Sequence, residues 1–145
     1  MTVMAKTYRP TMWRRLSNAV VMSMLRSGLA PQNYALLTVV GRSSGRGRST
    51  PVRPVHHGGS VWIVSPYGEV QWVRNARAAG EVTLTVRGIP QGHRVVESGP
   101  EESAPVLKEY VNVVPVSRRY FDARPADPLE LFAAEAHRHP VFRLE

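Results

Sequence analysis

Three arginines, Arg42, Arg46 and Arg48, alternate with glycines and serines in the segment GRSSGRGRST, residues 41–50. Backbone N–H groups in a glycine-rich turn can converge on an anion, and a guanidinium donates paired hydrogen bonds to phosphate or carboxylate. The segment lacks the G-x-x-x-x-G-K-[ST] pattern of a P-loop, and its glycines do not precede a predicted helix as in a dinucleotide-binding motif. The spacing alone therefore leaves two interpretations open, an anion-binding loop and a solvated loop.

The charge of the chain is unevenly distributed. Residues 1–68 contain one lysine, eight arginines and no acidic residue, whereas residues 69–145 contain ten basic and eleven acidic residues. Such an asymmetry favours an anionic partner for the first half, which could be nucleic acid, a membrane surface or a phosphorylated ligand. Basic residues are not regularly interleaved with aromatic ones, as they are on single-strand binding surfaces, so specific nucleic-acid binding is not expected.

The remaining reactive residues form no recognisable catalytic group or metal site. His56 and His57 are neighbours on a predicted strand and should face opposite sides of it. His137 and His139 are not accompanied by carboxylates or cysteines in a recognisable ligand spacing, and the chain has no cysteine. A cofactor that carries the chemistry itself would need none of these groups, because the protein then only binds and orients it.

The N-terminal part predicts a flexible basic arm over residues 1–11 and an amphipathic helix over 12–26, with apolar residues at helical spacing. This helix could pack against the domain or lie on an anionic membrane surface. No apolar run reaches the ~18 residues needed to span a bilayer, and the first residues do not have a signal-peptide pattern. We therefore expect a cytoplasmic protein, with peripheral contact to the inner face of the membrane as an option.

Residues 12–145 are expected to form one domain of strands and inserted helices. Strands are predicted over 34–40, 49–57 and 61–65. Pro51 and Pro54 restrict the second to a sheet edge or a bulged position, and Gly58-Gly59 turns it into the third. A helix over 69–80 precedes a strand over 81–88, and the segment GIPQG should turn that strand into a partner over 93–97. Further helices are predicted from Pro100 and over 129–137, followed by a strand over 140–145. The order predicts an α+β fold whose mostly antiparallel sheet curls into a barrel.

Two long segments, LLTVVGRSSGRGRSTPV and VWIVSPYGEVQWVRNARAAGEVTLTVRG, resemble the deazaflavin (coenzyme F420)-dependent nitroreductase family. This family is a branch of the split β-barrel flavin and deazaflavin oxidoreductases of actinobacteria. Its pattern is a G-R-x-S-G-x-x-R-x-x-P loop, a strand that ends in serine and a W-x-x-N-x-x-A helix. The residues that fit it are Gly41, Arg42, Ser44, Gly45, Arg48, Pro51, Ser65, Trp72, Asn75 and Ala78.

The resemblance implies that the chain binds 8-hydroxy-5-deazaflavin coenzyme, whose tail carries a phosphodiester, a lactyl group and glutamates. This polyanionic tail would explain the arginines of residues 41–50. The resemblance places along the tail Arg42, Ser43, Ser44, Arg48, Thr50, Pro51 and Val52. It places around the ring Ile63, Val64, Ser65, Pro66, Trp72 and Asn75.

Two positions differ from the family pattern. Ser43 stands where members commonly have lysine, and Arg46 could replace that charge. Pro66-Tyr67 stands where members often have Lys-Gly, so Tyr67 is expected to narrow the site or to change the acceptor that fits it.

The leading hypothesis is an oxidoreductase that passes a hydride from the reduced coenzyme to an apolar acceptor such as a quinone. Solvent or a hydroxyl, Ser65 or Tyr120, would supply the proton. The alternatives are an FMN-dependent oxidoreductase of the same fold and a non-catalytic deazaflavin carrier, and either a monomer or a homodimer is compatible with the sequence.

Overall fold

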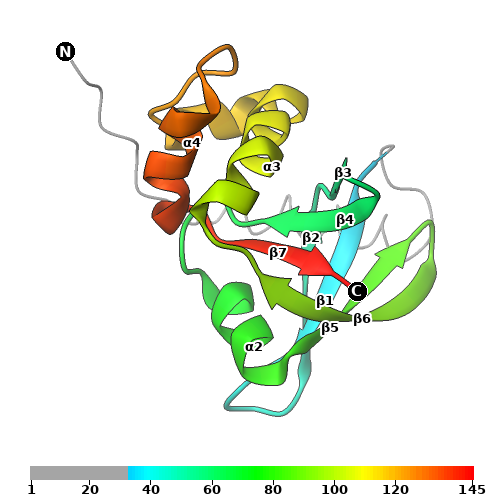
Figure 1. The fold of residues 1–145 in the computed structure, drawn as a ribbon. Coiled ribbons are helices and arrows are strands. Elements are labelled where there is room, and N and C mark those ends of the chain that lie inside the picture. Colours follow the sequence, from blue (N-terminus) through cyan, green and yellow to red (C-terminus); the bar gives the residue numbers. More distant parts are fainter. Residues whose placement is uncertain (1–32) are drawn as a thin grey trace.

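A computed structural model describes residues 33–145 (Figure 1). The predicted arm and the predicted helix over residues 12–26 lie outside the described residues. The elements, in chain order with η for a 3-10 helix, are β1 (Ala35–Val40), β2 (Gly47–Val52), β3 (Val55–His57), β4 (Ser60–Val64), α2 (Gln71–Ala79), β5 (Glu81–Val86), β6 (Ile89–Glu97), α3 (Pro100–Val113), η1 (Pro115–Tyr120), α4 (Leu129–Glu135), η2 (Ala136–Arg138) and β7 (Val141–Leu144).

The seven strands form one antiparallel sheet in the order β2-β1-β5-β6-β7-β4-β3. Strand β6 belongs to both halves of the sheet, because residues 89–94 pair with β5 and residues 95–97 pair with β7. The sheet therefore curls, and β2 and β3 lie at opposite edges although they follow each other in the chain. This arrangement confirms the predicted α+β fold with a curled antiparallel sheet.

Two apolar cores lie on the two sides of the central strands, with α2 on one side of β7 and α3 and α4 on the other (Figure 1). Strand β4 contributes to both, because alternate side chains of a strand point to opposite faces. Trp62 and Val64 pack with α3 and α4, whereas Ile63 packs with α2. Strands buried on both faces are rigid, so they form a firm support for the segments that begin at their ends. Among the described residues, no helix has the length and apolar character required to cross a membrane.

Two details of the predicted strands were wrong. The strand predicted over residues 49–57 is interrupted at Arg53-Pro54, and its two parts, β2 and β3, pair with different strands. The predicted turn GIPQG is also misplaced, because Arg87 and Gly88 make the turn with positive φ angles of 51° and 79°. Strand β6 therefore begins at Ile89 and includes four residues predicted to be part of the turn, residues 89–92. The Gly58-Gly59 turn was predicted correctly, with φ angles of 59° and 78° that suit a two-residue hairpin.

Candidate active site

A cleft of about 1050 Å³ lies between the edge strand β2, the turn after β4, helix α2 and the C-terminal end of α3. Its polar lining residues belong to β2, to Arg53 directly after β2, and to the first half of α2 with the preceding Glu69. The polar residues are Arg48, Ser49, Thr50, Arg53, Glu69, Gln71, Arg74 and Asn75. Its apolar and aromatic lining includes Tyr34, Val52, Val64, Pro66, Tyr67, Trp72, Tyr110, Val114 and Val116.

The polar part of the cleft is cationic. Arg48, Arg53 and Arg74 line it, and Glu69 is the one carboxylate among the described lining residues. The carboxylate of Glu69 forms an ion pair with Arg77, a residue outside the cleft lining, whose Nη1 lies 2.7 Å from Glu69 Oε1. The hydrogen bond and the charge of Arg77, together with the charge of Arg74, lower the pKa of Glu69, so its carboxyl stays ionised. Three arginines face this one carboxylate in the lining, so the cleft keeps a net positive charge that suits an anionic ligand.

The loop between β1 and β2, residues 41–46, is closed by its own hydrogen bonds. The backbone N–H of Gly41 donates to Arg46 O at 2.8 Å, and the Arg46 N–H donates to Ser44 Oγ at 3.2 Å. A Cβ atom at Gly41 would lie 2.5 Å from Ser44 Oγ, so a side chain at this position would displace the loop. The loop is thus held in one conformation by short contacts.

Arg42 attaches this loop to helix α2. Its backbone N–H and its Nη1 both donate to Asn75 Oδ1, at 3.1 and 2.7 Å, and Nη1 also donates to Gln71 Oε1 at 2.9 Å. Asn75 is buried, with 4% of its surface exposed. The first arginine of the motif is therefore engaged with the helix, whereas Arg48 lies on β2 with its side chain exposed at the cleft.

The inner end of the cleft contains a group of tyrosines. Tyr110 is 6% exposed, and burial raises its pKa far above the usual value, helped by Tyr67 and Tyr34 and opposed by the charge of Arg53. Tyr67 contacts Tyr120 edge-on, with ring centroids 4.9 Å apart. Tyr110 thus keeps its phenolic proton and can act as a hydrogen-bond donor inside the cleft.

The structure brings part of the predicted site together. The predicted residues that line the cleft are Arg48, Thr50, Pro51, Val52, Val64, Pro66, Trp72 and Asn75. The predicted residues that do not line it are Arg42, Ser43, Ser44, Ile63, Ser65 and Tyr120.

The predicted residues outside the cleft lining have other surroundings. Ile63 is fully buried in the core against α2. Ser65 is also fully buried, and its Oγ donates to the Gly68 carbonyl at 2.6 Å. Ser43 is exposed on the loop, and Tyr120 is buried beside Tyr67. These residues therefore shape the elements around the cleft.

Tyr34 and Tyr110 line the cleft but were not among the predicted site residues. Tyr110 follows Val106 and Leu107 at helical spacing on the buried side of α3. The available signal was a single phenol in an otherwise aliphatic stripe, because a buried tyrosine hydroxyl needs a polar partner or a polar cavity.

The curled antiparallel sheet with a cofactor-sized cleft beside its edge strand defines a protein of the split β-barrel class. Within that class, residues 9–122 match the F420H(2)-dependent quinone reductase family, and the chain belongs to this family. The family consists of oxidoreductases named for the reduced deazaflavin coenzyme.

Solved structures support the fold. One described as a domain-swapped dimer aligns with a TM-score of 0.59 and 20% identity, covering 94% of this chain and all of the other. An F420-H2 dependent reductase (FDR-A) aligns with a TM-score of 0.55 and 21% identity, covering 79% of this chain and 95% of the other. A putative pyridoxamine 5′-phosphate oxidase from Listeria innocua aligns with a TM-score of 0.53 and 12% identity, covering 88% and 90%. Comparison with curated protein sequences gives no significant match.

Proposed function

We propose that this protein is an oxidoreductase that passes a hydride from reduced coenzyme F420 to a small apolar acceptor such as a quinone. The observation that carries the proposal is one cleft lined both by arginines and by aromatic and apolar side chains in a member of this family. The arginines suit the polyanionic tail of the hydride donor, and the aromatic and apolar side chains suit an apolar acceptor.

The residues of the cleft fit this coenzyme. Arg48 and Arg74 are exposed at the cationic wall, where guanidinium groups can make charge-assisted hydrogen bonds to phosphate and carboxylate groups. Ser49 and Thr50 on the same strand add hydroxyl donors. The loop at residues 41–46 supports this wall at its Gly47 end.

The apolar lining suits a planar ring. Val64 is the last residue of β4, Pro66 lies two residues further along the chain, and Trp72 lies at the start of α2. The volume of about 1050 Å³ is at the upper end of the usual range of roughly 300–1,000 Å³ for small-molecule sites, so a ring and an acceptor can share the cleft.

When bound, the reduced coenzyme supplies the hydride, and this chain's residues orient the acceptor and exclude water. We assign to Tyr110 the role of donating a hydrogen bond to an acceptor oxygen, because its proton is retained and Arg53 lies near enough to influence its ionisation. Ser65 and Tyr120 support the cleft from behind, the first through Gly68 and the second through Tyr67.

The test is anaerobic mixing of the protein with reduced coenzyme F420 and a water-soluble naphthoquinone. We expect coenzyme oxidation that depends on both protein and quinone, with one quinol formed per coenzyme oxidised. Tight coenzyme binding with no oxidation would indicate a carrier, and binding of FMN in place of the deazaflavin would indicate the FMN-dependent alternative. Either result would contradict the proposal.

A further inference from the structure

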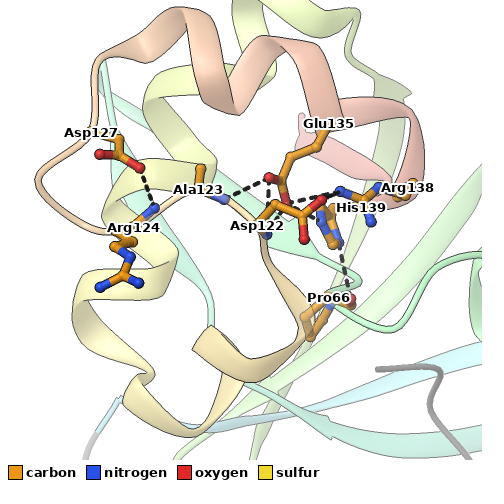
Figure 2. A network of polar contacts seen from close by, with 8 residues as sticks. All are labelled: Pro66, Asp122, Ala123, Arg124, Asp127, Glu135, Arg138 and His139. Atoms are coloured by element: carbon orange, nitrogen blue, oxygen red, sulfur yellow. Dashed lines mark hydrogen bonds and ion pairs between the residues drawn. The ribbon is translucent and has the colours of Figure 1, made fainter. Parts of the chain in front are cut away.

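A buried polar network lies directly behind the cleft wall at Pro66 (Figure 2). His139, which follows η2, is 2% exposed, and its ring stacks on Phe121 with centroids 3.8 Å apart. Its Nδ1 atom lies 2.9 Å from the Pro66 carbonyl oxygen, and its Nε2 atom lies 2.8 Å from Glu135 Oε1. Both ring nitrogens therefore face oxygen atoms.

The hydrogen-bond partners of Glu135 show which groups carry the protons. Its carboxylate accepts from the backbone N–H of Ala123 at 2.7 Å and from that of Asp122 at 3.1 and 3.2 Å. Burial raises the pKa of Glu135, but the hydrogen bonds from His139 and from these backbone groups outweigh burial and leave the pKa below its usual value. Glu135 is thus ionised and only accepts hydrogen bonds.

Two acceptors require two donors on the imidazole ring. The Pro66 carbonyl has no proton to donate, and the ionised Glu135 has none either. A neutral imidazole offers one N–H donor, whereas the imidazolium offers two. The doubly protonated ring satisfies both contacts of His139, and a neutral ring would place one bare nitrogen against an oxygen.

The network is attached to the segment that forms the cleft wall. The Ser65 N–H donates to Pro140 O at 2.9 Å, next to the bond between His139 and Pro66. Pro66 and Tyr67 both line the cleft. We infer that His139 is a positioning residue for the cleft: as an imidazolium held by Glu135, it fixes the Pro66 carbonyl and with it the wall formed by Pro66 and Tyr67.

The other charged groups around the ring are balanced. Arg138 Nη2 lies 2.7 Å from Asp122 Oδ2 and 3.7 Å from Glu135 Oε1. Figure 2 also draws Arg124 and Asp127 in the segment after η1, where the Arg124 N–H donates to Asp127 Oδ2 at 2.7 Å.

Two substitutions separate hydrogen bonding from charge. His139→Asn keeps an amide N–H near the place of Nδ1 but cannot titrate, and His139→Leu removes the donor. If the cleft binds coenzyme F420 as proposed above, His139→Leu should weaken the binding of oxidised coenzyme about tenfold, since an unsatisfied buried carbonyl is costly. His139→Asn should recover most of that affinity.

His137→Leu is the matched control, because His137 is exposed in the same segment. It should keep the affinity of the wild type. Equal effects of His137→Leu and His139→Leu would overturn the inference, as would a loss of affinity in His139→Asn as large as that in His139→Leu.

A second measurement needs no coenzyme. In ¹⁵N NMR spectra of the wild-type protein near neutral pH, both ring nitrogens of His139 should have the shifts of protonated nitrogens. The amide of Tyr67, which follows the Pro66 carbonyl, should keep its shift in His139→Asn and change it in His139→Leu. One unprotonated ring nitrogen, or an unchanged Tyr67 amide in His139→Leu, would contradict the inference. These NMR expectations do not depend on the binding of coenzyme F420, so the measurement tests this inference separately from the proposed function.

Discussion

The side-chain oxygen of Asn75 accepts hydrogen bonds from both the backbone N–H and the guanidinium of Arg42, at 3.1 and 2.7 Å. The glycine- and arginine-rich loop is thereby connected to helix α2 across 33 residues of sequence. Both walls of the cationic end of the cleft, β2 and α2, are positioned relative to each other by this contact. Arg42 and Asn75, two residues of the sequence motif, therefore have a structural role, because their contact holds the loop against α2.

Removal of this contact should loosen the cationic end of the cleft. Asn75→Ala leaves a backbone N–H without its acceptor and should lower the free energy of unfolding by about 1–3 kcal/mol, with weaker coenzyme binding. Urea denaturation and coenzyme titration measure the two effects. Gln71→Ala is the control for stability, because Gln71 is exposed and accepts only from Nη1 of Arg42. Equal losses of unfolding free energy in the two variants would show that the backbone contact has no special role.

Arg48 should bind the anionic tail directly. A charge-assisted hydrogen bond is worth about 1.5–3 kcal/mol, so Arg48→Ala should weaken coenzyme binding roughly tenfold or more, at an unchanged melting temperature. Arg94→Ala is a matched control for net charge, since its side chain is 81% exposed and lies outside the cleft lining. Small and equal losses of affinity in both variants would mean that only the overall positive charge attracts the coenzyme.

Tyr110 should act on the acceptor rather than on the coenzyme tail. Tyr110→Phe removes one neutral hydrogen bond, so kcat/KM for quinone should fall about two- to tenfold. The dissociation constant of the coenzyme should stay the same, because Arg48 and Arg74 are unchanged. Steady-state kinetics with the quinone as the varied substrate measures the first quantity. A loss of coenzyme affinity with unchanged quinone kinetics would contradict the assignment.

Glu135 should make the stability of the protein depend on acid pH. Its pKa is lowered in the folded protein from an ordinary value of 4.5, so its ionised form stabilises the fold above that pH. The contribution disappears as the pH falls from 4.5 through the lower folded value. The difference in unfolding free energy between wild type and Glu135→Gln should therefore shrink on acidification, as measured by urea denaturation at several pH values. A difference that is independent of pH in this range would show that the pKa of Glu135 is not lowered in the folded state.

Local sequence signals predicted most elements of the fold, and long-range pairing explains the errors. The break at Arg53-Pro54 occurs because the chain leaves one half of the curled sheet and enters the other, which a single strand pattern cannot reveal. The turn at Arg87 was missed because a non-glycine residue with positive φ is uncommon. In both cases the residue types fitted the predicted strand or turn, and the pairing with neighbouring strands determined where the strand begins and ends.

The assignment of cofactor-binding residues stays a prediction, but the structure shows which of them line the cleft. The motif includes Arg48 and Trp72, and both line it, because they belong to the edge strand β2 and to helix α2. It could not show that Arg42 is engaged with Asn75, since that contact depends on how the loop folds onto α2. His139 was set aside for want of a partner, although Glu135 stands four residues before it, a spacing that brings side chains together on one helical turn.

The central claim is that the cleft is built for a deazaflavin with a polyanionic tail. Fluorescence titration of the purified protein with oxidised coenzyme F420 and with FMN, at the same ionic strength, tests it most directly. The account predicts the lower dissociation constant for the deazaflavin, because the cleft arginines match several anionic groups and FMN carries one phosphate. An equal or lower dissociation constant for FMN would contradict it.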